Sequence, residues 1–362
     1  MLKRSLEILK QIEENGFQCY IVGGFVRDYC MKKDSYDVDI CTNARPKDLV
    51  NIFENAILPV EKYGSVTLFY KNIRFEITTF RKEFKYENRK PIDIEYTDNF
   101  IEDITRRDFT INALCMNSKG EIIDLLNGKK DIDNRIIRII GNAETKFSED
   151  PLRILRALRF ATQLNFKIDE YTLNAIKNNM HLLKDLTYQR KKDELNKIFI
   201  NKNVKNGLKL IVSLGIDKYL DLYNLDKIKI TSDAIGIWAQ LDNIELYPFS
   251  KLERDSIESI KKILKYKIIG TQELYKYGLY ICCIAAEILG ISKRTIVRME
   301  KVLPINSIKD IDITSTEICE LLKKNPNKWL KDIYKDLENK IVELKLKNRK
   351  DVIIKYILKN YS

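Results

Sequence analysis

Histidine is almost absent from this sequence: His181 is the only one among its 362 residues. Phosphohydrolases that bind metals through several histidines and aspartates, and zinc sites built on several histidines, need more than one. A Ser-His-Asp triad would depend on His181 itself, which lies in an amphipathic helical stretch where we expect a surface or packing role. The seven cysteines are scattered and show no paired zinc spacing, so we expect reduced thiols in the core. The classes of function that need several histidines are therefore excluded before any motif is considered.

Long apolar runs are also lacking. No stretch approaches the length of a membrane span, and the first residues begin an amphipathic helix rather than a signal peptide. A hydrophobic fraction of 44% is ordinary for a globular protein, and 362 residues are enough for two or more packed units. We therefore expect a cytoplasmic protein that does not bind membranes.

The chain has an excess of positive charge, with a net charge of +12. Residues 201–362 contain 30 Lys and Arg against 21 Asp and Glu, whereas residues 1–200 contain 34 against 31. A basic C-terminal half suits binding to a phosphate backbone. A general bias of the chain toward lysine, isoleucine and asparagine explains the excess equally well, so charge alone leaves both interpretations open.

Two adjacent glycines near the N-terminus come directly after a short apolar run. Cys19–Val22 is typical of a buried strand, and the apolar residues after Gly23 and Gly24 have helical spacing. Glycines at such a turn tolerate unusual backbone angles and let main-chain N–H groups approach an anion. An isolated Gly-Gly pair is usually only a turn, so its meaning depends on the residues that come after it in the chain.

Two aspartates come after the glycines. A second strand is predicted over residues 35–42, which would place Asp37 and Asp39 on the same face. Neighbouring carboxylates repel each other, and divalent metal ions would neutralise that repulsion. Glu76, on a later predicted strand, is either a third acid near the metals or the ion-pair partner of Arg74.

The order of these elements points to nucleotidyl transfer. A strand, Gly-Gly, a helix with Arg27 and Asp28, and then Asp-x-Asp place an anion-binding turn beside a metal site, as transfer from a triphosphate requires. Gly-Gly-x-Val-Arg-Asp followed by Asp-x-Asp-Ile resembles the signature of the class II tRNA nucleotidyltransferase and bacterial poly(A) polymerase family. The resemblance is strong over residues 17–200 and weak beyond them.

The resemblance implies an α+β fold. A polymerase β-like nucleotidyltransferase head, with a small mixed β-sheet and helices, would be followed by an all-α neck, body and tail. We expect the head over residues 1–140, the base-recognising neck over 141–200, and the tRNA-binding body and tail over 201–362. In the neck, Arg190 and Glu194 would support the helix that recognises the base.

A second motif lies at residues 106–112, which read Arg-Arg-Asp-Phe-Thr-Ile-Asn. Two arginines before an aspartate, followed by an expected apolar helix, are compatible with a charged helix start. The resemblance implies that Arg106 and Arg107 contact phosphates, and that Asp108 and Asn112 contact the ribose hydroxyls. A guanidinium group is suited to multidentate phosphate binding.

A third motif covers residues 147–160, where Ser148 is a suitable N-cap for a helix. Three arginines at a spacing of three residues form one stripe on that helix: Arg153, Arg156 and Arg159. If this stripe faces a sheet, burying its three charges costs free energy unless anions pair with the arginines. The resemblance implies that Asp150 and Arg153 hydrogen-bond the base edge, and that the other two arginines face phosphates.

The predicted reaction transfers a nucleotide from CTP or ATP to the 3′-hydroxyl of RNA and releases pyrophosphate. Asp37 and Asp39 would be the catalytic residues and the ligands of two Mg²⁺ ions. The preferred acceptor would be tRNA that lacks its 3′-terminal CCA, and the oligomeric state stays open. The nucleotide-binding residues would be Gly23, Gly24, Arg27, Arg107, Asp108, Asn112, Asp150, Arg153, Arg156 and Arg159.

Three alternatives remain. The first is a poly(A) polymerase of the same family, and the second is an enzyme that adds only CC or only A. The third, from another class, is a non-catalytic RNA-binding module, against which the intact Asp37 and Asp39 argue. Enzymes that add only CC lack a family loop whose residues this chain retains: Arg81, Glu83, Tyr86, Arg89 and Pro91.

Overall fold

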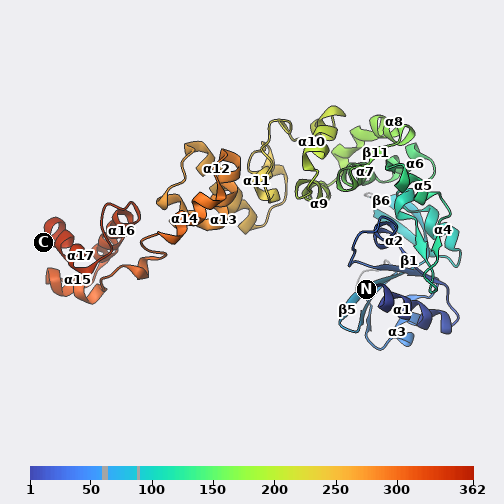
Figure 1. Cartoon of the computed structure of the whole chain (residues 1–362), viewed down its shortest axis with the longest axis horizontal. Helices are drawn as coiled ribbons and strands as arrows, with labels where there is room; N and C mark the ends of the chain where they lie inside the picture. The colour runs from blue at the N-terminus through green and yellow to red at the C-terminus, as the bar shows by residue number, and fades with distance from the viewer. Residues whose placement is uncertain (59–63, 88–89) are drawn as a thin grey trace. The chain divides into compact units, whose positions relative to one another are not determined.

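The computed structural model describes residues 1–58, 64–87 and 90–362, without the side chains of residues 83–94. The chain divides into two compact units, Met1–Leu222 and Tyr223–Ser362, which we describe separately (Figure 1). Unit 1 contains a mixed β-sheet with helices packed around it, and the described elements of unit 2 are all helical. The predicted α+β fold with a helical remainder is thus confirmed, while the three finer domain boundaries stay predictions.

The main sheet of unit 1 has the strand order β3-β4-β5-β2-β1-β8-β9. Its strands are β1 (Cys19–Val22), β2 (Asp39–Thr42), β3 (Ala56–Ile57), β4 (Ser65–Tyr70), β5 (Ile73–Thr79), β8 (Cys115–Met116) and β9 (Ile122–Ile123). β2 runs parallel to β5, and the other neighbouring pairs are antiparallel. Because β2 is central, its first residue, Asp39, is paired with Val22 on one side and with Glu76 on the other.

Two small sheets complete the β-structure of unit 1. β6 (Arg81–Glu87) and β7 (Lys90–Tyr96) form an antiparallel hairpin, and β10 (Ile136–Ile137) pairs in parallel with β11 (Lys167–Ile168). The hairpin lies where the resemblance placed the family loop, and its sequence is polar and non-periodic. Its strands pair only with each other, so neither has to show the alternating pattern of a strand in a larger sheet. The side chains of the family loop from Glu83 to Pro91 lie outside the described part.

The helices of unit 1 surround the main sheet and continue beyond it. The α-helices are α1 (Leu2–Glu14), α2 (Gly24–Cys30), α3 (Pro46–Ile52), α4 (Phe100–Thr105), α5 (Gly128–Asp133), α6 (Ala143–Glu149), α7 (Leu152–Leu164), α8 (Glu170–Asn179), α9 (Tyr188–Phe199) and α10 (Val204–Ser213). Short 3₁₀ helices are η1 (Thr110–Asn112), η2 (Met180–Asp185) and η3 (Asp217–Tyr219). The amphipathic helix α1 buries Ile8, Leu9 and Ile12 completely, as its apolar spacing predicts.

The predicted strand over residues 35–42 is shorter in the structure. β2 begins only at Asp39, and Asp37 lies in the irregular segment before it. The reason is that β1 ends at Val22, where Gly23 turns the chain into α2, so residues before Asp39 have no partner on that side. The two aspartates are therefore neighbours across a strand end rather than alternate residues of one strand.

The prediction of an apolar helix after Asp108 is also wrong. This segment forms the single turn η1 and then β8, whose Cys115 and Met116 pair with Val22 and Ile21 of β1. Burial on all sides, not an amphipathic helix face, explains why its residues are apolar.

The third motif contains two helices where one was expected. α6 ends at Glu149, so Ser148 lies in its last turn and is not an N-cap. Asp150 has an extended backbone (φ −141°, ψ 95°), as residues before proline prefer, and Pro151 starts α7. The Oδ1 atom of Asp150 accepts a hydrogen bond from the N–H of Leu152 at 3.2 Å. The break thus places Asp150, rather than Ser148, at the start of the arginine-bearing helix.

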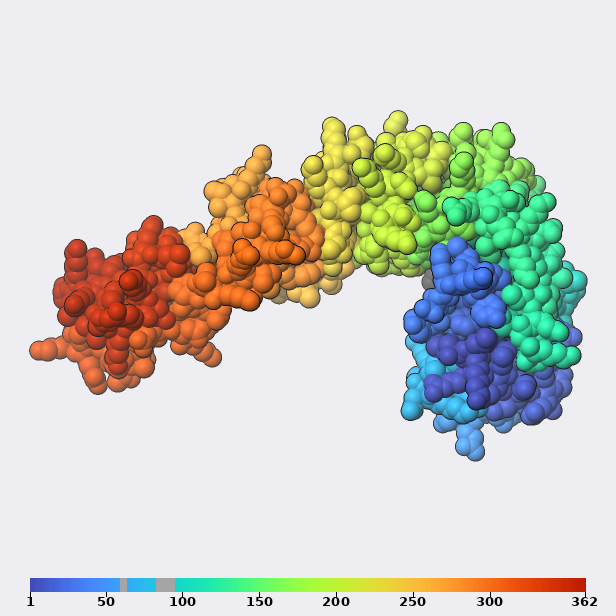
Figure 2. Space-filling view, in the orientation of Figure 1, coloured from blue at the N-terminus to red at the C-terminus, as the bar shows by residue number. Residues whose placement is uncertain are grey.

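Unit 2 consists of helices that pack through apolar side chains. Its elements are α11 (Ala234–Trp238), η4 (Ile244–Leu246), α12 (Lys251–Tyr266), α13 (Thr271–Leu289), α14 (Lys293–Lys301), η5 (Ile308–Asp310), α15 (Ser315–Leu322), α16 (Lys328–Val342) and α17 (Lys350–Tyr361). The last three helices enclose a core rich in isoleucine and form the red part of the surface in Figure 2. In the described part of the chain, no helix combines the length and apolar character needed to cross a membrane.

Gly128 is a position where the fold requires glycine. A Cβ atom there would lie 2.4 Å from the carbonyl oxygen of Thr110, in the turn η1 against which α5 packs. We expect Gly128→Ala to lower the free energy of unfolding by about 1–3 kcal/mol, because backbone atoms must shift. Urea denaturation checks this, with Lys129→Ala, an exposed change in the same helix, as the control. Equal stability of Gly128→Ala and the wild type would contradict so close a packing.

Candidate active site

An open cavity of about 640 Å³ in unit 1 brings the predicted site residues together. All twelve of them line it, although they come from α2, the start of β2, the segment around η1, and the start and face of α7. Arg106, for which the resemblance implied a phosphate contact, also lines it, and six further lining residues were not predicted as site residues: Asp28, Ser35, Arg81, Leu152, Phe160 and Gln163. The cavity combines two carboxylates at a strand end with a concentration of arginines.

Gly23 shapes the turn at one wall of the cavity. It has a φ of +80°, which favours glycine, and it caps α2. A Cβ atom at this position would lie 3.7 Å from Oδ2 of Asp39. The glycine therefore provides the backbone turn and also leaves the carboxylate open to the cavity.

The carboxylate of Asp39 lies in a negative environment. Partial removal from water, and then the charges of Asp37 and Glu76, raise the pKa of Asp39 to about 6, and Arg107 only partly offsets this. Among the residues with described positions, no three His, Cys, Asp or Glu side chains already form a closed metal site. Two oxygen-bearing side chains with uncompensated negative charge nevertheless fit a hard divalent cation that takes its other ligands from water or phosphate.

A hydrogen-bonded network connects α2 with α7 across the cavity. Arg27 Nη1 donates to Oδ1 of Asn112 at 2.8 Å, and Asn112 Nδ2 donates to Oδ1 of Asp108 at 3.3 Å. The other carboxylate oxygen of Asp108 accepts two hydrogen bonds from Arg156, one of them from Nε at 2.7 Å. Burial would raise the pKa of Asp108, but Arg156 and these hydrogen bonds outweigh it and lower the pKa. Asp108 is thus an ionised acceptor.

Arg107 is held at the end of α4 by a buried acid. Asp103 is completely buried and pairs with Arg106 at 2.7 Å and with Arg107 at 3.0 Å. Among the described residues, Nε of Arg107 has no hydrogen-bond partner although it is buried. This guanidinium group therefore keeps hydrogen-bonding capacity while its orientation is fixed from one side.

The predicted base-recognising pair is supported by α6 and α9. Arg190 Nη2 donates to Oδ2 of Asp150 at 3.0 Å, while Arg153 Nη1 donates to the carbonyl oxygen of Lys146 at 2.7 Å and to Glu149 at 3.1 Å. Arg153 is only 6% exposed, so its side chain has little freedom. The sequence indicated a supporting role for Arg190, and the structure places it in contact with Asp150.

The third arginine of the stripe also contacts α9. Nε of Arg159 lies 2.8 Å from Oε2 of Glu194, which is 3% exposed and also pairs with Lys197 at 2.9 Å. The stripe on α7 is thus met by acids from other elements: Arg156 by Asp108 and Arg159 by Glu194. This arrangement explains how several charged side chains are accommodated with little exposure to solvent.

Of the residues that the sequence did not indicate, Phe160 is the most enclosed by the site. It lies seven residues after Arg153 and four after Arg156, which is the spacing of one helix face, so the helical period was the available signal. Gln163 continues the same face. Arg81 carried no such periodic signal, because it reaches the cavity from a hairpin; the sequence indicated it only as a residue of the family loop.

Comparisons with known proteins agree with this geometry. Three family models match: the poly A polymerase head domain at residues 19–138, the probable RNA and SrmB-binding site of polymerase A at 165–221, and tRNA nucleotidyltransferase domain 2 (putative) at 243–357. A CCA-adding enzyme of Ligilactobacillus salivarius is 34% identical, over 97% of this chain and 95% of its own. One of Staphylococcus epidermidis is 32% identical, over 99% and 98%.

A solved structure supports the same assignment. The Bacillus stearothermophilus CCA-adding enzyme in complex with CTP superposes with a TM-score of 0.87 at 26% identity, over 99% of this chain and 96% of that one. The similarity extends through unit 2, where the sequence motifs were weak. The chain therefore belongs to the family of CCA-adding enzymes, the tRNA nucleotidyltransferases.

Proposed function

We propose that this chain adds CCA to the 3′ end of tRNA from CTP and ATP without a nucleic-acid template. The reaction joins the α-phosphate of the triphosphate to the RNA 3′-hydroxyl and releases pyrophosphate. One observation carries the proposal: a single cavity joins Asp37 and Asp39 to Asp150, Arg153 and a set of arginines. The groups proposed to bind metal, phosphate and base therefore line the same cavity.

Asp37 and Asp39 would hold Mg²⁺, since their uncompensated charge suits a divalent cation. When bound, the metal supplies charge stabilisation at phosphate and lowers the pKa of the attacking hydroxyl. The chain's own arginines bind the triphosphate, and Asp103 keeps Arg107 in place for this role. Asp108 and Asn112 would accept from and donate to the ribose hydroxyls.

Protein side chains would select the base. Cytosine and adenine both present an amino donor and a neighbouring acceptor, which a carboxylate and a guanidinium can satisfy together. Asp150 is oriented by its hydrogen bond from Arg190, and Arg153 by Glu149 and the carbonyl of Lys146. Guanine and uracil present an acceptor where the amino group should be, so Asp150 would face a lone pair.

Unit 2 would bind the tRNA. The protein would act in the cytoplasm. Residues 223–362 contain 26 Lys and Arg against 19 Asp and Glu, an excess of basic side chains suited to phosphates. In solved structures, CCA-adding enzymes bind CTP, ATP and, in Thermotoga maritima, tRNA. We carry these ligands over to this chain as part of the proposal.

A truncation tests the role of unit 2. We expect a chain that ends at Leu222 to bind tRNA more weakly and with a shallower salt dependence, because fewer counterions are released on binding. The slope of log affinity against log salt should decrease by about two or more. Binding of CTP by the truncated chain, which retains the whole cavity, is the control. An unchanged slope would mean that the basic excess of unit 2 is only compositional.

The alternatives differ in their products. Purified protein is incubated with Mg²⁺ and either tRNA that ends before CCA or tRNA that ends in CC, with CTP alone, ATP alone and both, and the 3′ ends are sequenced. We expect two cytidines from CTP alone and CCA, with no further addition, from both. Long adenosine runs from ATP alone would indicate a poly(A) polymerase. Addition of one adenosine, and only to tRNA that ends in CC, would indicate an A-adding enzyme. No incorporation in any mixture would contradict an enzymatic function.

A further inference from the structure

Three guanidinium groups surround one aromatic ring in the cavity. The Cζ atom of Arg159 lies 4.2 Å from the centroid of Phe160, and those of Arg27 and Arg156 each lie 5.5 Å from it. The ring is only 7% exposed, so the contacts are largely shielded from water. Phe109 completes the surroundings edge-on, with 5.7 Å between the ring centroids.

These three positive charges would repel one another without a group between them. Burial lowers the pKa of Arg159; the charge of Glu194 opposes this, and the positive charges of Arg156 and Arg27 add to the lowering. Each arginine has its own acid, but the acids come from separate elements: Asp28 of α2, Asp108 before η1 and Glu194 of α9. These ion pairs do not join the three arginines directly: Arg27 and Arg156 are linked indirectly, through Asn112 and Asp108, and Arg159 pairs with Glu194 instead.

The ring of Phe160 lies close to all three guanidinium groups, whereas each of these acids pairs with one of them. The face of an aromatic ring attracts cations through its quadrupole, and the attraction grows when the groups are removed from water. Because the ring carries no charge, it does not compete with a phosphate for the guanidinium groups. A carboxylate at this position would compete with a phosphate for the guanidinium groups, and an aliphatic side chain would lack the attraction of the ring face.

We propose that Phe160 is a positioning residue that gathers Arg27, Arg156 and Arg159 into one polyphosphate-binding cluster. The inference rests on the proposed function for the identity of the ligand, a nucleoside triphosphate. It also connects the two parts of the site, since Arg27 belongs to α2 beside the Gly-Gly turn whereas Phe160 belongs to α7. A ring that attracts the guanidinium groups less strongly should therefore weaken the binding of triphosphate. It should leave the rate of nucleotide transfer in the bound complex largely unchanged.

Graded fluorination of the ring tests this in the full-length protein. Phenylalanines with one, two and three ring fluorines at position 160 keep the shape but progressively weaken the quadrupole. We expect the Kd of CTP, and that of inorganic tripolyphosphate, to rise stepwise to about tenfold for three fluorines. We expect kcat at saturating CTP to change less than twofold. Phe160→Tyr should resemble the wild type, and Phe160→Leu the trifluorinated protein.

Phe166 is a matched control. It is 8% exposed, follows the end of α7, and no cation lies over its ring among the residues that the structure describes. The same fluorinated series at position 166 should leave both dissociation constants unchanged. A flat series at position 160, or equal slopes at 160 and 166, would overturn the inference because the ring would then act only by packing.

The two ligands separate this inference from the proposed function. A graded response with tripolyphosphate in a protein that does not bind CTP would support the cluster and contradict the nucleotide-binding function. Normal binding of CTP with a flat series would support the function and overturn the role of Phe160. Absence of binding of either ligand by the wild type would contradict both.

Discussion

Replacing Asp39 with asparagine is expected to lower turnover on the order of a thousandfold, because the site loses the charge that binds Mg²⁺. The same change should leave the melting temperature at pH 8 unchanged or higher. The folded-state pKa of Asp39 is raised from 3.8 to about 6, so its charge opposes folding fully above about pH 6 and not at all below pH 3.8. Nucleotide incorporation and thermal unfolding without added metal, at pH 8 and pH 4, measure the two effects.

Asp34→Asn is the matched control for this change. Asp34 is an exposed acid five residues earlier that does not line the cavity around Asp39. It should retain full turnover. Near-normal incorporation by Asp39→Asn, or a melting temperature several degrees below that of the wild type at pH 8, would contradict the assignment of Asp39 to a metal site that is unfavourable for stability.

Replacing Asp150 with alanine is expected to lower kcat/KM for both CTP and ATP by about 10²–10⁴, because the base edge loses its acceptor. The change also leaves Arg190 without the carboxylate that it contacts at 3.0 Å in the wild type. Discrimination against UTP should decrease at the same time, since the carboxylate no longer disfavours an acceptor on the base. Steady-state kinetics with CTP, ATP and UTP measure all three quantities.

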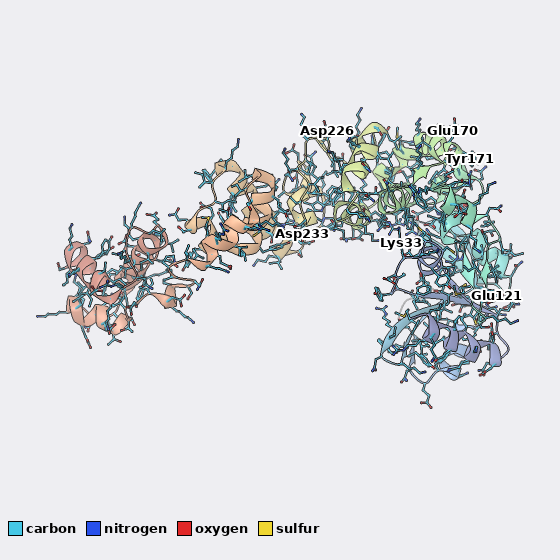
Figure 3. All side chains as sticks on the ribbon, viewed as in Figure 1. Lys33, Glu121, Glu170, Tyr171, Asp226 and Asp233 are labelled. Atoms are coloured by element: carbon cyan, nitrogen blue, oxygen red, sulfur yellow. The ribbon has the colours of Figure 1, made fainter. Side chains whose placement is uncertain are left out.

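Glu170→Ala is the control for the loss of an acid near the start of a helix. Glu170 is exposed in the first turn of α8, away from the cavity lining (Figure 3). It should leave all three kcat/KM values within twofold of the wild type. A fall of the same size with Glu170→Ala, or an Asp150→Ala protein that still prefers CTP and ATP as before, would mean that Asp150 does not recognise the base.

Local patterns in the sequence predicted the parts of the fold that local chemistry determines. The Gly-Gly turn and the arginine stripe both appear where the sequence predicts them. Lys71 and Asn72 both have positive φ, as expected for a tight hairpin turn. The twelve predicted site residues line one cavity because their motifs lie at the ends of neighbouring elements.

Long-range contacts determine what the sequence left open or predicted wrongly. Asp37 is outside β2 because β1 has already ended, and the apolar residues after Asp108 join β1 as β8. Neither fact is encoded in the segment concerned. The pair of Asp108 and Arg156 joins residues 48 positions apart, and the cations around Phe160 come from α2 as well as α7. Such contacts carry no periodic signal, so only the folded chain shows them.

The most direct test of the account is a crystal structure of this protein with CTP and Mg²⁺. It should show the cytosine edge at Asp150 and Arg153, the triphosphate among Arg27, Arg107 and Arg156, and the metal at Asp37 and Asp39. ATP should occupy the same cavity. CTP bound outside this cavity, or bound in it with its base away from Asp150 and Arg153, would contradict the account.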